Sequence, residues 1–148
     1  MKTLKAALLL AFSISIAVVS YGQDNKVSAN KFADNIERIT VEELKAKVER
    51  GDKIVILDVR GGDYDSSSTK IRGAVRIAPA DLQSRLGEIP HDREIITYCA
   101  CSTDGGAVKA AETLLANGFK QVRALRGGWN AWTQAGGPVE QKEVATSR

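Results

Sequence analysis

Runs of apolar residues alternate along this chain with segments in which apolar residues recur at helical spacing. Continuous apolar runs span 53–58 and 94–98, and shorter ones span 73–77 and 121–125. A strand that is buried on both faces has this continuous character, which is typical of a parallel sheet. We therefore expect four strands at these positions.

Helices are predicted before and between these strands. Thr40 and Glu43 have the spacing of a capping box, and Gly51 closes the helix that they begin. Further helices are expected over 79–86, over 107–116 and from 127 to about 135. The alternation of helix and strand predicts an α/β domain with a mainly parallel sheet and helices on both faces.

The chain begins with the pattern of a secretory signal peptide. Lys2 and Lys5 lie at the start of an almost wholly apolar segment that continues to residue 19, and Ser20 and Gly22 place small residues where a signal peptidase cleaves. The apolar segment is short for a membrane span, although an uncleaved anchor is the alternative. We expect cleavage after Gly22 and an exported protein, either periplasmic or secreted.

Cleavage of a signal peptide over 1–22 would leave one domain that is close to neutral. We expect a polar lead-in over 23–38, a domain over 39–140 and a flexible tail over 141–148. The leader contains two of the 21 basic residues and no acidic residue. The mature chain has no basic run, so we expect no nucleic-acid partner and no stable membrane span.

The loop after residue 98 carries the best candidate for a reactive group, because ligands bind beyond the carboxyl ends of parallel strands. Cys99 follows the predicted strand directly, and a small-residue loop leads from it to the next helix: Ala100, Cys101, Ser102, Thr103, Asp104, Gly105 and Gly106. Backbone N–H groups at a helix N-terminus lower the pKa of a thiol. We predict that these loop amides hold Cys99 as a thiolate; a buried, inert cysteine is the alternative.

Five separated segments resemble the rhodanese-like family, and they occur in the family's order. They are 54–60, 71–74, 96–99, 118–122 and 125–132, and the resemblance covers 40–139. It implies a rhodanese-like fold, with a mainly parallel five-stranded sheet and helices on both faces. Active members of the family are sulfurtransferases.

The resemblance also implies a mechanism. Cys99 would take sulfane sulfur from thiosulfate, mercaptopyruvate or a protein persulfide, and would pass it from a persulfide to cyanide or to another thiol. The loop from Ala100 to Gly106 would hold the persulfide anion, and the kinetics would be ping-pong. In the family, the residues at Asp58 and Arg60 mostly order neighbouring loops, and we expect the same here; direct contact with the substrate is the alternative. No cofactor is implied.

Three features depart from the family pattern. Asp104 stands where an Arg or Lys usually faces the anionic substrate, which predicts that thiosulfate is a poor donor. The loop is about two residues longer than the common form, and Thr69-Lys70 replaces the usual Gly-His. Lys70, Arg72 and Arg76 are either substitute cations or part of an ordinary solvated face.

Cys101, the two tryptophans and the single histidine are the remaining candidates. Cys101 either resolves an oxidised or persulfidated Cys99 or fills space in the loop. Trp129 and Trp132 have helical spacing and are expected in the core rather than at a ligand. His91 precedes a strand and should lie away from the site, and the few Cys and His residues argue against a metal site.

Three other functions compete with sulfur transfer as interpretations of this loop. A non-catalytic or redox-regulatory binding module is the main alternative, because Asp104 replaces a cation. A phosphatase or arsenate reductase would need an Arg in the loop, and none lies between Cys99 and Val108. The Cys-x-Cys spacing disfavours a thioredoxin-like oxidoreductase.

Overall fold

Five parallel strands form the central sheet of the protein. The computed structural model describes residues 35–143, so the predicted leader over 1–22 lies outside the described residues. The strand order is β1-β6-β5-β2-β4, and every pair is parallel. The strands are β1 (Arg38–Ile39), β2 (Ile54–Asp58), β4 (Val75–Arg76), β5 (Glu94–Tyr98) and β6 (Val122–Leu125). The predicted α/β fold with a five-stranded parallel sheet is confirmed.

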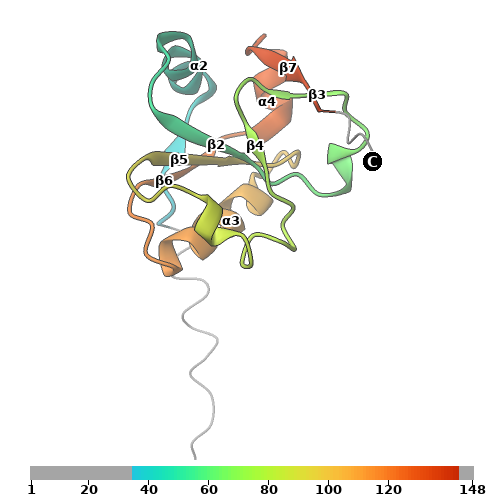
Figure 1. Ribbon diagram of the computed structural model, residues 1–148. Coiled ribbons are helices and arrows are strands. Elements are labelled where there is room, and N and C mark those ends of the chain that lie inside the picture. The colour runs from blue at the N-terminus through green and yellow to red at the C-terminus, as the bar shows by residue number, and fades with distance from the viewer. Residues whose placement is uncertain (1–34, 144–148) are drawn as a thin grey trace, which may run out of the picture.

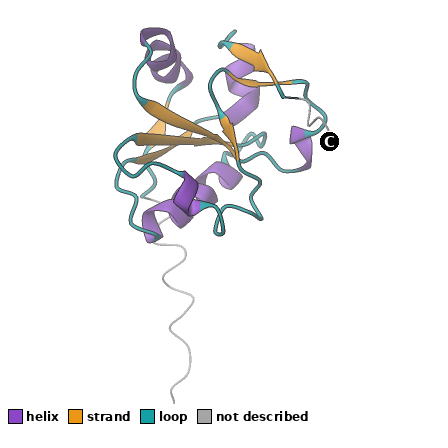
Figure 2. Cartoon of the chain, viewed as in Figure 1, coloured by secondary structure: helices purple, strands orange, loops and turns teal. Residues whose placement is uncertain are grey.

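Helices cover both faces of this sheet, as predicted. Figures 1 and 2 show α2 and α4 on one face and α3 on the other. The helices are α2 (Val41–Arg50), α3 (Gly105–Ala116) and α4 (Gly128–Gln134), with 3-10 turns η1 (Gly62–Tyr64) and η2 (Leu86–Glu88). The carboxyl ends of the strands, where chemistry was expected, therefore lie between two helical layers.

The start and end of α2 follow the predicted capping pattern. The Thr40 hydroxyl accepts a hydrogen bond from the Glu43 N–H at 3.2 Å. Gly51 ends the helix with φ of +72°, a conformation that glycine adopts without steric cost.

Two apolar layers hold the sheet between the helices. In β2, Val55 and Leu57 pack on the α3 side, whereas Ile56 packs with Leu44 of α2 on the other side. The strand is therefore buried on both faces, which explains why its sequence is a continuous apolar run.

The helix predicted over 79–86 is wrong. The segment forms successive turns and ends in the 3-10 turn η2. The Ser84 hydroxyl donates to the Asp81 carbonyl at 2.9 Å. Side chains of this kind offer the backbone an alternative to helical hydrogen bonds, and Gly87 weakens a helix further.

A small second sheet was not predicted from the sequence. β3 (Thr69–Ile71) pairs antiparallel with β7 (Val139–Gln141). β1 begins at Arg38 and β7 ends at Gln141, each one residue outside the range 39–140 that the sequence predicts for the domain. These strands have two or three residues each, which is too short for a recognisable sequence pattern. Hydrogen bonds to their partner strands stabilise them.

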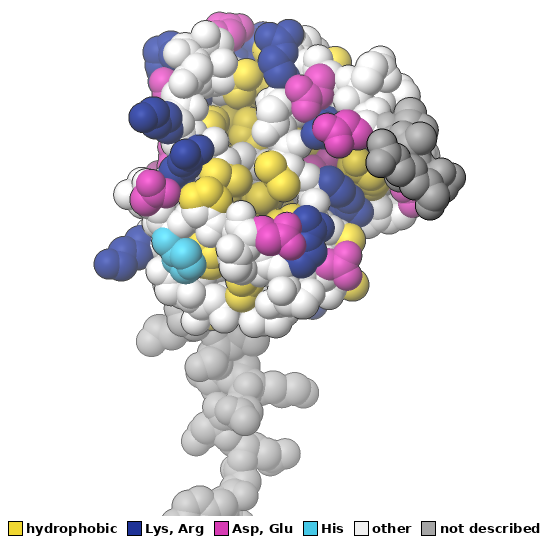
Figure 3. Space-filling view, in the orientation of Figure 1, with side chains coloured by type: hydrophobic (Ala, Val, Ile, Leu, Met, Phe, Trp, Pro, Cys, Tyr) yellow, Lys and Arg dark blue, Asp and Glu magenta, His cyan; other side chains and the backbone are white. Residues whose placement is uncertain are grey.

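β4 is one of the two edge strands of the large sheet, and its Val75 is 48% exposed. Figure 3 shows apolar side chains gathered on this face of the molecule. They surround a hollow of about 320 Å³ that Ile54, Val75 and Ile89 help to line. Among residues 35–143, no helix has the length and apolar character needed to cross a membrane.

Candidate active site

The loop after β5 buries Cys99 and exposes Cys101. Cys99 is only 3% exposed, whereas Cys101 lies at the surface. The loop ends at Gly105, the first residue of α3. The buried Thr97 hydroxyl donates to the Ala107 carbonyl at 2.8 Å. This bond fixes the first turn of α3 relative to the strand that carries Cys99.

The first turn of α4 holds the loop backbone from the other side. The Trp129 N–H donates to the Cys99 carbonyl at 2.8 Å, and the Asn130 side chain donates to the Ala100 carbonyl at 3.1 Å. Gly128 has φ of +53°, and a Cβ atom there would lie 2.2 Å from the Cys99 carbonyl oxygen. Only glycine permits this approach, so main-chain contacts determine where Cys99 sits.

Gly106 lies against both sulfur atoms of the loop. A Cβ atom at Gly106 would lie 3.5 Å from the Cys99 Sγ and 3.6 Å from the Cys101 Sγ. The Cys99 Sγ also lies 4.0 Å from the Cys101 carbonyl oxygen. The loop therefore curls so that two thiols separated by one residue face the same point of α3.

The Cys99 thiol is a weaker acid than an ordinary cysteine. Burial, together with a hydrogen bond that the Cys99 thiol donates to the Cys101 sulfur, raises the pKa of Cys99 to about 11. The backbone N–H groups of Ala107 and Cys101 lower the pKa by less. The predicted lowering of the pKa is therefore wrong, because loss of solvent outweighs the amides.

The amides near the sulfur differ in part from those predicted. Cys101, within the predicted loop, contributes one. The Asp104 N–H instead donates to the Cys101 carbonyl at 3.2 Å. Ala107 contributes the other and was missed, although it is the third residue of α3, where backbone N–H groups have no partner within the helix.

Asp104 forms an ion pair with Arg38 of β1. The Arg38 Nε and Asp104 Oδ2 are 3.2 Å apart, and Asp104 is 7% exposed. Asp104 has φ of +49°, the sole positive φ of a non-glycine residue in the described part of the chain. A cation therefore balances the carboxylate that was expected to repel an anionic substrate.

Asp58 and Arg60 form a fully buried ion pair at the carboxyl end of β2. The Arg60 Nη2 lies 2.6 Å from Asp58 Oδ2, and both side chains are 0% exposed. The Tyr98 hydroxyl donates to Asp58 Oδ2 at 2.5 Å and accepts from the Ile71 N–H at 3.3 Å. Burial and the Asp58 charge raise the pKa of Tyr98, so this hydroxyl stays protonated. The network joins β2, β5 and β3.

Arg60 extends this network to the loops around Cys99. Its guanidinium lies 4.4 Å from the centre of the Trp129 ring and 5.1 Å from that of Tyr64. Its Nη2 also donates to the Thr69 carbonyl at 3.1 Å. Arg60 thus packs beneath α4 and beside the 61–69 loop, a position suited to the predicted ordering role.

The other aromatic candidates lie in or beside the core. Trp132 is 0% exposed and donates from Nε1 to the Pro138 carbonyl at 3.1 Å, whereas Trp129 is half-buried over Arg60. His91, the single histidine (cyan in Figure 3), is exposed and stacks on Phe119 at 3.8 Å, before the start of β5. No metal-binding group of three His, Cys, Asp or Glu side chains occurs within residues 35–143.

Two of the three candidate substitute cations have other partners. Lys70 pairs with Glu140 at 3.2 Å and donates to the Ala74 carbonyl. Arg76 donates to the Asp58 carbonyl at 3.0 Å and lies 4.2 Å from the Tyr64 ring centre. Arg72 is exposed.

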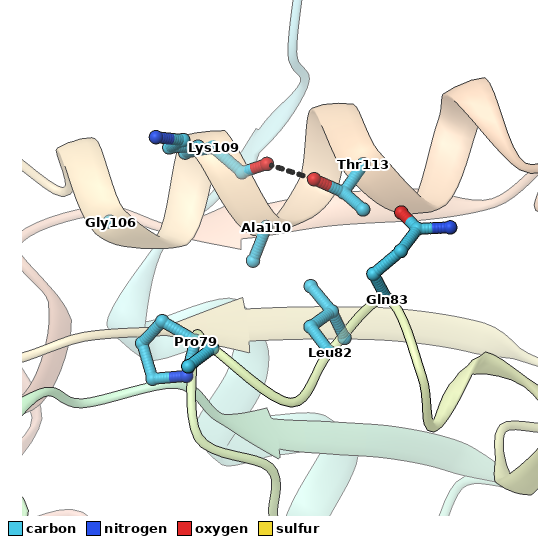
Figure 4. A pocket seen from close by; sticks show the side chains of 8 residues that line it. Pro79, Leu82, Gln83, Gly106, Lys109, Ala110 and Thr113 are labelled. Carbon is cyan, nitrogen blue, oxygen red and sulfur yellow. Dashed lines mark hydrogen bonds between the residues drawn. The ribbon is translucent and has the colours of Figure 1, made fainter.

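Hollows reach the Cys99 loop from two sides. A groove of about 390 Å³ separates α3 from the 79–83 turns, and Gly106 forms part of its wall. Figure 4 shows Leu82 and Ala110 facing one another across this groove, with Gly106 farther along α3. A second, polar hollow of about 290 Å³ is lined by Asp63, Ser66, Ser67, Ala100, Trp129 and Asn130.

Residues 40–135 match the family model of the rhodanese-like domain. The chain belongs to the rhodanese-like family. The matched range contains both cysteines, the loop between β5 and α3, and the Asp58–Arg60 pair.

Relatives and solved structures agree with this assignment. A sulfurtransferase of Allochromatium vinosum is 26% identical over 108 residues, covering 73% of this chain and 98% of the relative. YrkF of Bacillus subtilis, named as a candidate sulfur carrier protein, is 32% identical over 102 residues, which are 68% of this chain and 53% of YrkF. This chain therefore spans about half the length of YrkF. The solution structure of a rhodanese-like domain from Anabaena superposes with a TM-score of 0.62 at 28% identity, covering 74% and 83% of the two chains.

Proposed function

We propose that this chain is an exported sulfurtransferase in which Cys99 carries sulfane sulfur as a persulfide. The observation that carries the proposal is the placement of one thiol at the carboxyl end of β5, against Gly106 and next to a groove. Family membership and the sulfurtransferase from Allochromatium vinosum support the same reaction class.

The proposed reaction has two steps at Cys99. Its thiolate attacks the sulfane sulfur of thiosulfate or a similar donor; the donor's S–S bond breaks, and sulfite leaves with the bonding electrons. An acceptor thiolate or cyanide then attacks the outer sulfur of the persulfide, and the Cys99 thiolate leaves. No net oxidation occurs over the cycle, and no cofactor is needed.

The amides of Cys101 and Ala107 suit the charged states of this cycle. They already lower the pKa of the thiol against the effect of burial. A persulfide places its negative charge one atom farther from Cys99, nearer the N-terminus of α3, whose N–H groups favour anions. We infer that α3 stabilises the intermediate more than it stabilises the resting thiolate.

The matching experiment is a turnover assay on the reduced chain. With thiosulfate and cyanide we expect thiocyanate, and with thiosulfate alone we expect an added mass of about 32 Da on Cys99, the mass of one sulfur atom. Cys99→Ser should lose both signals while keeping its folded far-UV circular dichroism. Absence of both product and adduct with every sulfane donor tested would overturn the proposal.

A redox-regulatory or binding module is the second candidate. The raised pKa of Cys99 favours it, because a thiol that stays protonated reacts slowly. Protein taken from its native compartment separates the two functions: a persulfide on Cys99 supports sulfur carriage. A stable disulfide or an unmodified thiol, together with no turnover, supports the second candidate.

Export rests on the leader predicted over residues 1–22. The mature N-terminus is the direct test: expression in the source organism should yield a chain that begins at Gln23 and is absent from the cytoplasmic fraction. A cytoplasmic chain that retains Met1 would contradict export but would leave the proposal of sulfur transfer at Cys99 unaffected.

A further inference from the structure

We propose that Cys101 receives the sulfane sulfur from Cys99 and presents it to the acceptor. This inference rests on the proposed function, because it needs a persulfide on Cys99. It assigns the exposed thiol of the pair a place in the second half of the reaction.

The first argument is the contrast in exposure. Cys99 is 3% exposed and lies beneath the loop, whereas Cys101 is exposed on the same loop. Every nucleophile must approach the outer sulfur along the line of the breaking S–S bond, and a macromolecule cannot bring its thiol along that line to a sulfur as buried as that of Cys99. The exposed Cys101 removes that restriction.

The second argument is the shared position of the two sulfur atoms. Both lie in contact with the position of a Cβ atom at Gly106, at 3.5 and 3.6 Å. The Cys101 thiol also hydrogen-bonds with the Cys99 thiol and helps to raise its pKa. An outer sulfur on Cys99 would therefore lie within reach of the Cys101 sulfur, and such an intramolecular step has a high effective concentration.

The transfer conserves atoms and electrons. The Cys101 thiolate, formed by loss of its proton to solvent, attacks the outer sulfur of the Cys99 persulfide. The S–S bond to Cys99 breaks, Cys99 leaves as a thiolate that takes up a proton, and a persulfide forms on Cys101. An acceptor thiolate then removes the same outer sulfur from Cys101.

Attack on the inner sulfur is the competing reaction. It would release hydrosulfide and form a Cys99–Cys101 disulfide. That ring spans residues only two apart, where the geometry that a disulfide prefers fits poorly. Both cysteines are free in the structure. The outer-sulfur route is therefore the one that the loop favours.

The test compares a small and a bulky acceptor on the full chain. Wild type and Cys101→Ser are loaded with limiting thiosulfate and then mixed with cyanide or with a thiol-terminated polyethylene glycol of several kilodaltons. Because Cys101 lies against the Cys99 thiol, its substitution also alters the reactivity of Cys99. The rate of transfer to the bulky thiol is therefore divided, in each protein, by the rate of thiocyanate formation. This ratio should fall by about tenfold or more in Cys101→Ser, the loss of one well-placed intramolecular step.

A matched control moves the thiol to another exposed position. Glu49 lies exposed on α2, so Glu49→Cys in the Cys101→Ser background restores an exposed thiol without restoring its place beside Gly106. We expect no rescue. Fragmentation of the loaded wild-type peptide should also find the added sulfur on both cysteines.

Three results would overturn the relay. They are equal transfer to the bulky thiol, relative to thiocyanate formation, with and without Cys101, rescue by Glu49→Cys, or hydrosulfide release with a Cys99–Cys101 disulfide as the main product. A wild-type chain that never gains sulfur on Cys99 would instead refute the proposed function itself, and the relay with it.

Discussion

Arg38 and Asp104, 66 residues apart in sequence, form an ion pair between the edge strand β1 and the residue that precedes α3. The pair changes the expected effect of Asp104 on the binding of an anionic donor at the Cys99 loop. An isolated carboxylate there would repel anionic donors, whereas a paired one adds little net charge. Thiosulfate is therefore expected to remain a usable donor.

Loss of Arg38 should expose the Asp104 charge. We expect Arg38→Gln to raise KM for thiosulfate by about 2- to 5-fold, the effect of one partly screened charge. Asp104→Asn in the same background should reverse the increase, and high salt should reduce it. If Asp104→Asn has no effect in the Arg38→Gln protein, the carboxylate does not influence the donor.

The reactivity of Cys99 should rise steeply with pH. Because its pKa is raised to about 11, the thiolate is a small fraction near neutrality and increases about tenfold per pH unit below the pKa. Alkylation of Cys99 by iodoacetamide, followed by peptide mass spectrometry, should show this slope from pH 7 to 10.

Cys101 supplies part of that raised pKa, so Cys101→Ser should move the alkylation profile of Cys99 to lower pH. A plateau below pH 8 in the wild type would contradict the burial argument. An unchanged profile in Cys101→Ser would contradict the contact between the two thiols.

Breaking the buried Asp58–Arg60 pair should be costly. Arg60→Leu leaves a carboxylate without its cation at a position with no solvent, and such changes cost about 3–5 kcal/mol. Arg50 and Asp52 form a matched exposed pair with the same spacing, and Arg50→Leu should cost far less stability because solvent screens both charges. Urea denaturation measures the free energy of unfolding of both variants. Equal losses would mean that burial does not determine how much an ion pair contributes to stability.

Gly128→Ala should displace the Cys99 loop. The added Cβ would lie 2.2 Å from the Cys99 carbonyl oxygen, so the backbone must move. Gly136→Ala has a similar positive φ but no atom within 4 Å, and should cost only the strain of about 1–3 kcal/mol. Loss of Cys99 loading in Gly128→Ala, beyond any loss in Gly136→Ala, is the expected result; equal loading in the two would refute the role of this contact.

Gly106→Ala should restrict the space beside both sulfur atoms. Its Cβ would lie 3.2 Å from the Cys99 Cβ, whereas a Cβ at the neighbouring Gly105 meets only Thr103, at 3.8 Å. We expect slower persulfide formation in Gly106→Ala than in Gly105→Ala, measured by mass spectrometry after mixing with thiosulfate. The reverse order would place the incoming sulfur elsewhere.

Four strands of the large sheet, β2, β4, β5 and β6, were predictable because each lies in a local apolar run. Glu94–Tyr98 was predicted with its observed bounds, and α2 followed from Thr40 and Gly51. β1, β3 and β7 were not predictable, because two or three residues carry too little pattern and their stability comes from distant partners. The 79–86 segment contains helix-start signals, but its Asp and Ser side chains favour turns.

The site was predictable in position but not in electrostatics. The strand end at Cys99 follows from topology, as does the place of Asp58 and Arg60. The raised pKa of Cys99 depends on burial by α3 and α4, and the pairing of Asp104 depends on Arg38, a residue that the sequence assigned to the lead-in. Such long-range contacts leave no local pattern.

The contact of Gly128 with the Cys99 carbonyl has a consequence for how this domain can diversify. Main-chain atoms of the Cys99 loop and of the first turn of α4 position the nucleophile, so exchange of the side chains over 100–104 need not move it. Different residues therefore determine the two properties: the side chains over 100–104 would set donor preference, whereas the main-chain contacts set the position of Cys99. A library that varies only those five positions should yield proteins of different substrate range on one unchanged backbone.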